Sequence, residues 1–271
     1  MTVMEMPLRS GVGIAPPRPH VRIQHLRKTY NAYIALEDIN LDLRPAEFIG
    51  VLGPSGCGKS TLLKCVAGLT PIESGVIEIH GQTVTEPPND MAIVFQRDIL
   101  LDWRRVLDNI LLPIEFKRQP KAKWTAKALE LLEVMGLKGL ETRYPWELSG
   151  GQRQRVAICR ALIQSPSLLL MDEPFGALDA LTRDELNLEL QRVWMQTHKS
   201  VLFITHGITE AIFLSDRVVV MAANPGRILE VIDIDLPRPR TLDMRETPEF
   251  GRYAKHIRHL FENLGVLKGR P

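Results

Sequence analysis

Two short stretches of this sequence have the composition of phosphate-binding loops. Residues 53–61 read GPSGCGKST and follow an apolar run that is expected to form a strand. Residues 148–152 read LSGGQ and open a run with helical character. Unpaired N–H groups at the start of a helix attract anions, so each stretch is a candidate anion site. The sequence therefore predicts one more phosphate site than a single nucleotide requires.

The first stretch fits a nucleotide-binding loop between a strand and a helix. Its glycines allow the backbone to approach phosphate oxygens closely, and the helix start adds partial positive charge. Lys59 is expected to reach the β- and γ-phosphates, Ser60 to bind Mg²⁺ and Thr61 to bind a phosphate oxygen. The expected nucleotide-binding residues of this loop are Gly53, Pro54, Ser55, Gly56, Cys57, Gly58, Lys59, Ser60 and Thr61.

Two acidic residues end the apolar run SLLLMDE at residues 167–173. Runs of this kind form central parallel strands that are buried on both faces. Asp172 is placed to hold Mg²⁺, and Glu173 is placed to orient or deprotonate a water molecule. We therefore expect the metal and the attacking water to lie at the end of this strand, beside the first loop.

Three further polar or aromatic residues follow expected strands. Gln96 ends the run MAIVFQ and is a candidate ligand of the metal or partner of the attacking water. His206 ends the run SVLFITH, at the carboxyl end of a strand, where open α/β sheets bind ligands. We expect His206 to contact the γ-phosphate. Tyr30 is the candidate to stack on adenine, and Tyr33 is the alternative.

The second stretch is predicted to begin a capped helix. Ser149 is a good N-cap residue, and Gly150 and Gly151 leave the first N–H groups uncovered. By itself this pattern is equally typical of an ordinary capped helix. Its place between a phosphate loop and the run SLLLMDE makes it informative about function.

Composition limits the classes of partner. The sequence has 34 Lys and Arg residues against 32 Asp and Glu, and this net charge of +2 favours neither nucleic acid nor a polybasic membrane anchor. No apolar run is long enough to span a bilayer, so a role at a membrane is expected to need a partner. The three cysteines lack CxxC or metal spacing, which indicates reduced thiols in a cytosol.

Cys57 has two interpretations, because it lies inside the first loop at an expected helix start. In the first, its thiol has a lowered pKa, and alkylation of the thiol blocks nucleotide binding. In the second, Cys57 is an inert, partly covered thiol.

The expected elements predict an α/β fold. It has a parallel core sheet, an antiparallel β subdomain and an inserted α-helical subdomain at about 97–148. We divide the chain into a flexible N-terminus (1–20), a main domain (21–235) and a C-terminal part (236–271) with a basic, proline-containing link and an amphipathic helix. Packing of this helix on its own domain is favoured over docking to a partner. The sequence NPGR indicates a type II turn between two late strands.

The order of these motifs resembles that of the nucleotide-binding subunits of ABC transporters, which are P-loop NTPases. The motifs are GPSGCGKST, Gln96, LSGGQ, LLLMDE, GALD at residues 176–179 and His206, and the resemblance covers residues 21–233. The resemblance implies an ABC ATPase domain. It also implies a set of residues that bind or hydrolyse MgATP, namely Lys59, Ser60, Gln96, Asp172, Glu173 and His206.

The resemblance further implies a dimer with shared sites, formed by two copies or by two paired ATPase subunits. The residues that would face the γ-phosphate of ATP held by the other subunit are Ser149, Gly150, Gly151 and Gln152. Asp179 would cross the interface. Each ATP would then lie between one chain's phosphate loop and its partner's LSGGQ helix. This arrangement accounts for two phosphate sites in one chain.

Longer matches, such as RDILLDWRRVLDNILLP and DEPFGALDALTR, are similar to the nitrate/sulfonate/taurine branch of bacterial importers. This branch implies a peripheral subunit on the cytoplasmic face of the inner membrane that energises uptake of a small organic or inorganic anion. Its partners would be a transmembrane permease and, indirectly, a periplasmic or extracellular substrate-binding protein. Leu100, Leu101 and Trp103 would transmit motion to the permease.

One departure from the family pattern is Gly207, which stands where Asp often follows the histidine. We expect a looser start of the next helix without loss of hydrolysis, because Glu173 and His206 are both present. A P-loop kinase or GTPase is the alternative function, but it leaves LSGGQ without a role. A chromosome-maintenance ATPase needs long heptad arms, and a structural protein has no use for Glu173.

Overall fold

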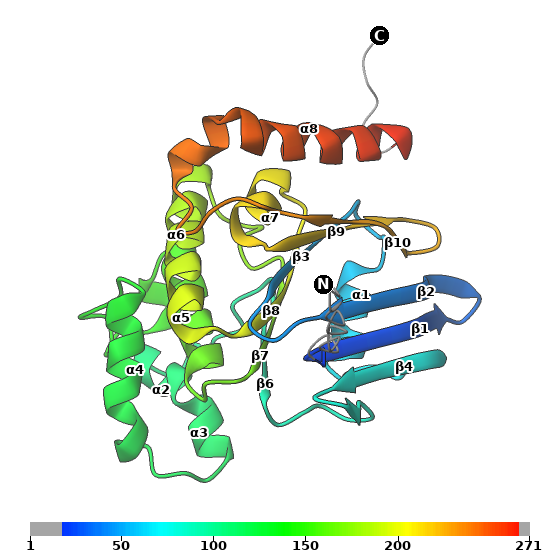
Figure 1. Ribbon diagram of the computed structural model, residues 1–271. Coiled ribbons are helices and arrows are strands. Elements are labelled where there is room, and N and C mark those ends of the chain that lie inside the picture. Colours follow the sequence, from blue (N-terminus) through cyan, green and yellow to red (C-terminus); the bar gives the residue numbers. More distant parts are fainter. Residues whose placement is uncertain (1–17, 266–271) are drawn as a thin grey trace, which may run out of the picture.

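The larger of two sheets forms the centre of the computed structural model, which describes residues 18–265 (Figure 1). Its strand order is β10-β9-β3-β8-β7-β6. All strands run parallel except β10, which pairs antiparallel with β9. The strands are β3 (Phe48–Leu52), β6 (Met91–Val94), β7 (Leu168–Asp172), β8 (Ser200–Thr205), β9 (Arg217–Ala222) and β10 (Arg227–Asp233). The expected flexible N-terminus falls mainly on residues 1–17, outside the described part.

The smaller sheet is antiparallel, with the order β2-β1-β4-β5. Its strands are β1 (Val21–Tyr30), β2 (Tyr33–Leu43), β4 (Ser74–Ile79) and β5 (Gln82–Thr83). Helix α1 (Lys59–Val66) packs its apolar side chains into one cluster with residues of both sheets. The phosphate loop therefore enters a helix that is fixed between the two sheets.

On the opposite face of the core sheet, its side chains form one apolar cluster with those of the remaining helices. The insert between β6 and α5 contains α2 (Val106–Ile110), α3 (Leu112–Phe116), α4 (Ala122–Val134) and η1 (Pro145–Glu147). The other elements are α5 (Gly150–Leu162), α6 (Ala180–Thr197), α7 (Ile208–Leu214), η2 (Leu242–Glu246) and α8 (Pro248–Asn263). Parallel core, antiparallel subdomain and helical insert are all present, which confirms the predicted fold class.

The C-terminal helix α8 packs on its own chain and crosses the top of Figure 1. Phe250, Ala254, Ile257 and Phe261 form its buried stripe and belong to the same apolar cluster as α7. Their three- and four-residue spacing is the amphipathic pattern seen in the sequence. The favoured interpretation of this helix is thus confirmed.

The turn between β9 and β10 is not the predicted type II turn. Such a turn needs a positive φ at Gly226, but the positive φ in this turn lies at Asn224, at 58°. The glycine serves close packing, because a Cβ at Gly226 would overlap the carbonyl oxygens of Ala35 and Cys57. The turn therefore packs directly against the phosphate loop.

Arg240, in the proline-containing link, is buried to 2% exposure. Its guanidinium donates hydrogen bonds to Ile212 O at 2.6 Å, in the last turn of α7, and to Ser215 O at 2.7 Å, at the C-cap. It also donates to Leu236 O, at 3.3 Å. Burial lowers the pKa of Arg240 to about 10. Carbonyls at a helix end have no partner within the helix, so Arg240 closes the end of α7.

We predict that Arg240→Ala lowers the free energy of unfolding by about 2–4 kcal/mol, because several buried carbonyls lose their donor. Urea denaturation monitored by circular dichroism measures the change. Arg22→Ala is the matched control, since Arg22 is half-exposed and pairs with Asp42 at 3.6 Å. The control should change stability by less than about 1 kcal/mol. Equal effects of the two substitutions would contradict the capping role.

Candidate functional site

Three strand ends define the candidate site. Strands β3, β8 and β7 are parallel neighbours in register, so their last residues lie side by side. The residues that follow these strands are Gly53, His206 and Glu173. The edge where they meet is the carboxyl edge of the sheet, where open α/β folds bind ligands.

Residues 53–61 wrap around the start of α1. Gly58 is the N-cap with a φ of 93°, a left-handed conformation that favours glycine. A Cβ at Gly58 would lie 2.8 Å from the carbonyl oxygen of Ala35, so β2 leaves room only for glycine. The Nζ of Lys59 donates to two carbonyl oxygens of the loop, at 2.9 and 3.1 Å. The buried ammonium is therefore held across the loop.

Ser60 and Asp172 meet at the position expected for a metal. The Ser60 hydroxyl donates a hydrogen bond of 2.8 Å to the Asp172 carboxylate. Burial raises the pKa of Asp172, while the bond from Ser60 acts in the opposite direction. Gln96 and Ser60 both line the pocket over the phosphate loop that is described below. Within residues 18–265 no three His, Cys, Asp or Glu side chains group as a metal cage. The hydroxyl and carboxylate oxygens of Ser60 and Asp172 are of the kind that Mg²⁺ prefers.

Glu173 lies against both His206 and Lys59. Its carboxylate accepts a hydrogen bond from His206 Nδ1 at 3.2 Å, and its other oxygen is 3.9 Å from Lys59 Nζ. Glu173 has a φ of 45°, a conformation that is uncommon and strained for a residue with a side chain. Its N–H donates to Ile204 O at 2.9 Å, which holds this backbone in place. The candidate base, the histidine and the phosphate-binding lysine are thus brought together.

The pocket over the loop has a volume of about 390 Å³. It is lined by Tyr30, Tyr33, Ala35, Ser55, Gly56, Gly58, Lys59, Ser60, Thr61, Gln96 and Glu173. Tyr30 and Tyr33 pair at the end of the β1–β2 hairpin, so both aromatic candidates belong to this wall. Sequence reasoning missed Ala35. The sequence did contain a signal for Ala35. It lies two residues after Tyr33 on the same strand, so its side chain is on the same face of the hairpin as that of Tyr33.

The LSGGQ stretch lies elsewhere in the chain. Ser149 is the N-cap of α5 and accepts from the N–H of Gln152 at 3.2 Å. Gly151 packs against α6, since a Cβ there would lie 2.5 Å from Thr182. Asp179 is the N-cap of α6. Among the described residues that line the phosphate-loop pocket, none belongs to 149–152 and none is Asp179. One chain therefore does not bring its two anion sites together.

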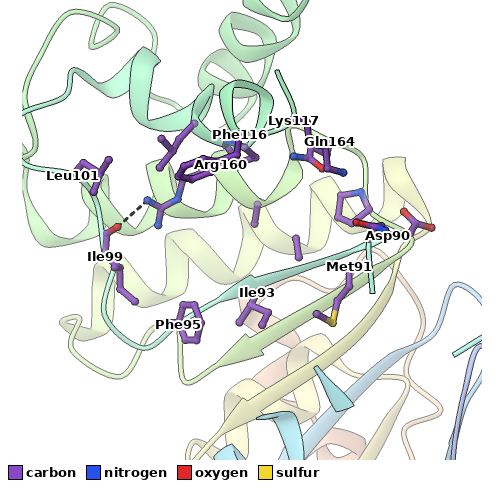
Figure 2. Close-up of a pocket in the computed structure, with 16 residues that line it drawn as sticks. Asp90, Met91, Ile93, Phe95, Ile99, Leu101, Phe116, Lys117, Arg160 and Gln164 are labelled. Carbon is purple, nitrogen blue, oxygen red and sulfur yellow. Dashed lines mark hydrogen bonds between the residues drawn. The ribbon is translucent and has the colours of Figure 1, made fainter. Parts of the chain in front are cut away.

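A second cavity, of about 580 Å³, lies between β6, α3 and α5 (Figure 2). Mainly apolar side chains line it, including Ile93, Phe95, Leu101 and Phe116. Arg160 of α5 donates to Ile99 O at 2.8 Å across one wall. We call this cavity the insert groove. Of the three residues expected to transmit motion, Leu101 lines the groove, Leu100 packs on the core, and Trp103 is 73% exposed outside the lining.

Cys57 is fully buried under the loop. Burial raises the pKa of its thiol, and this effect outweighs the attraction of Lys59. The structure contradicts the lowered pKa of the first interpretation and shows a covered thiol, as in the second. That the thiol is inert stays a prediction. Proximity to a helix start lowers a thiol pKa only where the thiolate is accessible to that field and to water.

We predict that iodoacetamide at neutral pH modifies Cys57 in the folded protein at least about tenfold more slowly than in the urea-unfolded chain. Peptide mass spectrometry measures both rates. Cys65 and Cys159, also buried, serve as internal references in the same digest. Fast modification of the folded protein that MgATP prevents would return Cys57 to the reactive class.

Comparisons with known proteins agree with this geometry. Residues 36–176 match the family described as ABC transporter. The taurine import ATP-binding protein TauB of Escherichia coli (strain K12) is 46% identical over 218 residues, which are 80% of this chain and 86% of that protein. An uncharacterized ABC transporter ATP-binding protein, MJ0412 of Methanocaldococcus jannaschii, is 44% identical over 247 residues, 90% of this chain and 91% of the relative.

Solved structures give the same result. A dimeric structure of MJ0796, a bacterial ABC transporter cassette, has a TM-score of 0.71 and 29% identity, covering 80% of this chain and 100% of that chain. The same cassette in a post-hydrolysis state bound to ADP and Pi matches with the same score and coverage. Sequence family, relatives and fold agree with the site at the carboxyl edge of the sheet. The chain belongs to the ABC transporter family.

Proposed function

We propose that this chain is the ATPase subunit of an importer and works as a head-to-tail homodimer. As a member of its family, the chain binds and hydrolyses ATP. The observation that supports the dimer is that the phosphate loop and the capped start of α5 are separate within one chain. A two-fold rotation places the LSGGQ stretch of one copy over the loop of the other. Asp179, at the start of the neighbouring α6, then lies at the same interface.

Residues of the pocket, together with the adjoining Asp172, would hold MgATP. Tyr30 stacks on adenine, the loop N–H groups and Thr61 bind phosphate oxygens, and Lys59 neutralises the β- and γ-phosphates. Ser60, Asp172 and Gln96 offer the oxygen ligands that Mg²⁺ prefers. When bound there, Mg²⁺ offsets negative charge on the phosphates.

Hydrolysis uses the contact between Glu173 and His206. Glu173 accepts a proton from the attacking water, whose oxygen bonds to the γ-phosphorus as the bond to ADP breaks. His206 holds the Glu173 carboxylate at 3.2 Å and contacts the γ-phosphate. ATP binds the closed dimer better than the open one, so its loss after hydrolysis opens the dimer.

The insert groove is the surface that we assign to the permease. Its apolar lining suits a cytoplasmic segment of a membrane protein with an apolar face. One wall is tied to α5, because Arg153 pairs with Asp98 at 3.0 Å and Arg160 donates to Asp98 O at 2.7 Å. Asp98 is two residues after Gln96, which lines the phosphate-loop pocket. A segment bound in the groove therefore contacts a wall that is joined to Gln96 on one side and to α5, the LSGGQ helix, on the other.

The transported substrate is a small anion of the sulfonate, taurine or nitrate type. The similarity to a taurine import protein supports this class. Permease and a separate substrate-binding protein would select the cargo, and this chain would work at the cytoplasmic face of the inner membrane. None of the helices within residues 18–265 is long and apolar enough to cross a membrane.

We predict that Glu173→Gln lowers kcat by about 10²–10⁴-fold, because the water loses its base. ATP affinity should stay unchanged, and ATP should hold the variant as a dimer on size-exclusion chromatography. Glu249→Gln, an exposed change on α8, is the matched control and should behave as the native chain. Near-native turnover by the Glu173→Gln variant would remove Glu173 from its role as base.

We predict that Phe116→Glu abolishes co-purification with the permease of the same transporter, because it places charge beside the apolar groove. Phe116 is 77% exposed, so folding and ATP binding should persist. Leu229→Glu on β10, also exposed, is the control and should keep the permease bound. Retention of the permease by the Phe116→Glu variant would assign the permease to another surface.

A further inference from the structure

Helix α7 begins at Ile208, two residues after His206, and its start has no capping side chain. Its N-cap is Gly207, with φ −88° and ψ 110°, and it makes no side-chain cap hydrogen bond. The first N–H groups of a helix need partners, which an N-cap Asp, Asn, Ser or Thr usually provides. Something other than the N-cap must fix the backbone that carries His206.

The last residue of β8 and the first turn of α7 provide that fixation. Thr205 Oγ1 accepts a hydrogen bond of 2.9 Å from the N–H of Gly207. The same hydroxyl donates its hydrogen to the Glu210 carboxylate. Thr205 is 2% exposed and Glu210 is 7% exposed, so the chain of bonds is shielded from water. It spans His206 and joins the residues on both sides.

The two ends of this bend are fixed independently. Thr205 lies in β8, which pairs with strands on both sides. The last turn of α7 is held by Arg240 through Ile212 O and Ser215 O. Backbone freedom between these supports is therefore concentrated at His206 and Gly207. A small rotation there moves the imidazole away from Glu173.

Glu210 has no role in the proposed binding of MgATP, because it does not line the phosphate-loop pocket. Burial raises the pKa of Glu210, and Thr205, Arg183, His206 and Arg245 act in the opposite direction. Its second oxygen, Oε1, has no hydrogen-bond partner among the described residues. A buried carboxyl that bonds through one oxygen serves as an acceptor for Thr205. This local role needs the acceptor oxygen and not the negative charge.

We propose that the Thr205–Glu210 pair is a positioning device that fixes the backbone at the uncapped Gly207 and holds His206 against Glu173. The inference rests on the role proposed above for His206. Thr205 and Glu210 are not among the residues that line the pocket over the phosphate loop, and they act through the backbone of His206. The pair also accounts for the tolerance of glycine at position 207.

Thr205→Val tests the pair by removing the hydroxyl at constant shape. kcat for ATP should fall about ten- to a hundredfold, because small displacements of a reacting group carry such a cost. KM for ATP should change much less than kcat, since the loop and Lys59 keep their contacts. Thr205→Ser and Glu210→Gln keep the hydroxyl and the acceptor, and should keep most of the turnover, whereas Glu210→Ala should lose it. Thr197→Val, which removes a hydroxyl bonded to Val193 O at 2.8 Å in α6, is the control.

A second substitution separates positioning from general stability. Gly207→Asp supplies a side chain that can cap α7. The backbone conformation at position 207 suits any residue. A Cβ there would lie 3.3 Å from the Glu210 Cβ, so the cap fits with a small adjustment. In the Thr205→Val background, Gly207→Asp should restore kcat to within about twofold of the native value. Failure of this rescue in a protein with a native melting temperature would overturn the inference.

His206→Ala is measured in parallel to distinguish the two proposals. An inactive His206→Ala variant beside a fully active Thr205→Val variant would overturn the positioning role alone. A fully active His206→Ala variant would overturn the role of His206 and this inference with it. Loss of kcat in both, with recovery by Gly207→Asp only in the Thr205→Val background, is the result that we expect.

Discussion

The parallel pairing of β3, β8 and β7 is the constraint on which the site depends. Their register places the last residues of three strands at one edge, and the chemistry follows directly after each strand. Gly53 opens the phosphate loop, His206 follows β8, and Glu173 follows β7. A shift of one residue in a strand turns its side chains to the opposite face, which would separate Glu173 from His206. The buried apolar runs therefore fix the distances within the proposed site as well as the core.

The supports behind this edge come from distant parts of the chain. Gly226 packs the β9–β10 turn against the phosphate loop. Arg240 holds the end of α7, and Thr205 with Glu210 holds its beginning. Since preorganised groups lower the cost of reaching the reactive geometry, these buried bonds contribute to rate as well as to stability. They also explain how glycine follows His206 without disordering the edge.

Motifs with a local mechanism could be predicted from the sequence. The loop at 53–61 needs only its glycines and Lys59 between a strand and a helix, and Asp172 was recognisable at the end of an apolar run. Contacts between distant residues could not be predicted. The burial of Cys57 depends on the sheets around α1, and the burial of Arg240 depends on α7, which the basic, proline-containing link does not indicate. The predicted type II turn was wrong for the same reason. The conformation of Gly226 is set by close packing against the phosphate loop and not by the Pro-Gly dipeptide alone.

The central claim is that each site is completed by a second copy, and a cross-link between two different variants tests it directly. Ser55→Cys and Ser149→Cys, both at exposed positions, are made in separate chains that also carry Glu173→Gln. Disulfides form only when the two Cα atoms come within about 7 Å. Under mild oxidation with ATP, the mixture of the two variants should give a species of twice the chain mass, and each variant alone should not. Absence of this species from the mixture, with ATP demonstrably bound, would contradict the shared site.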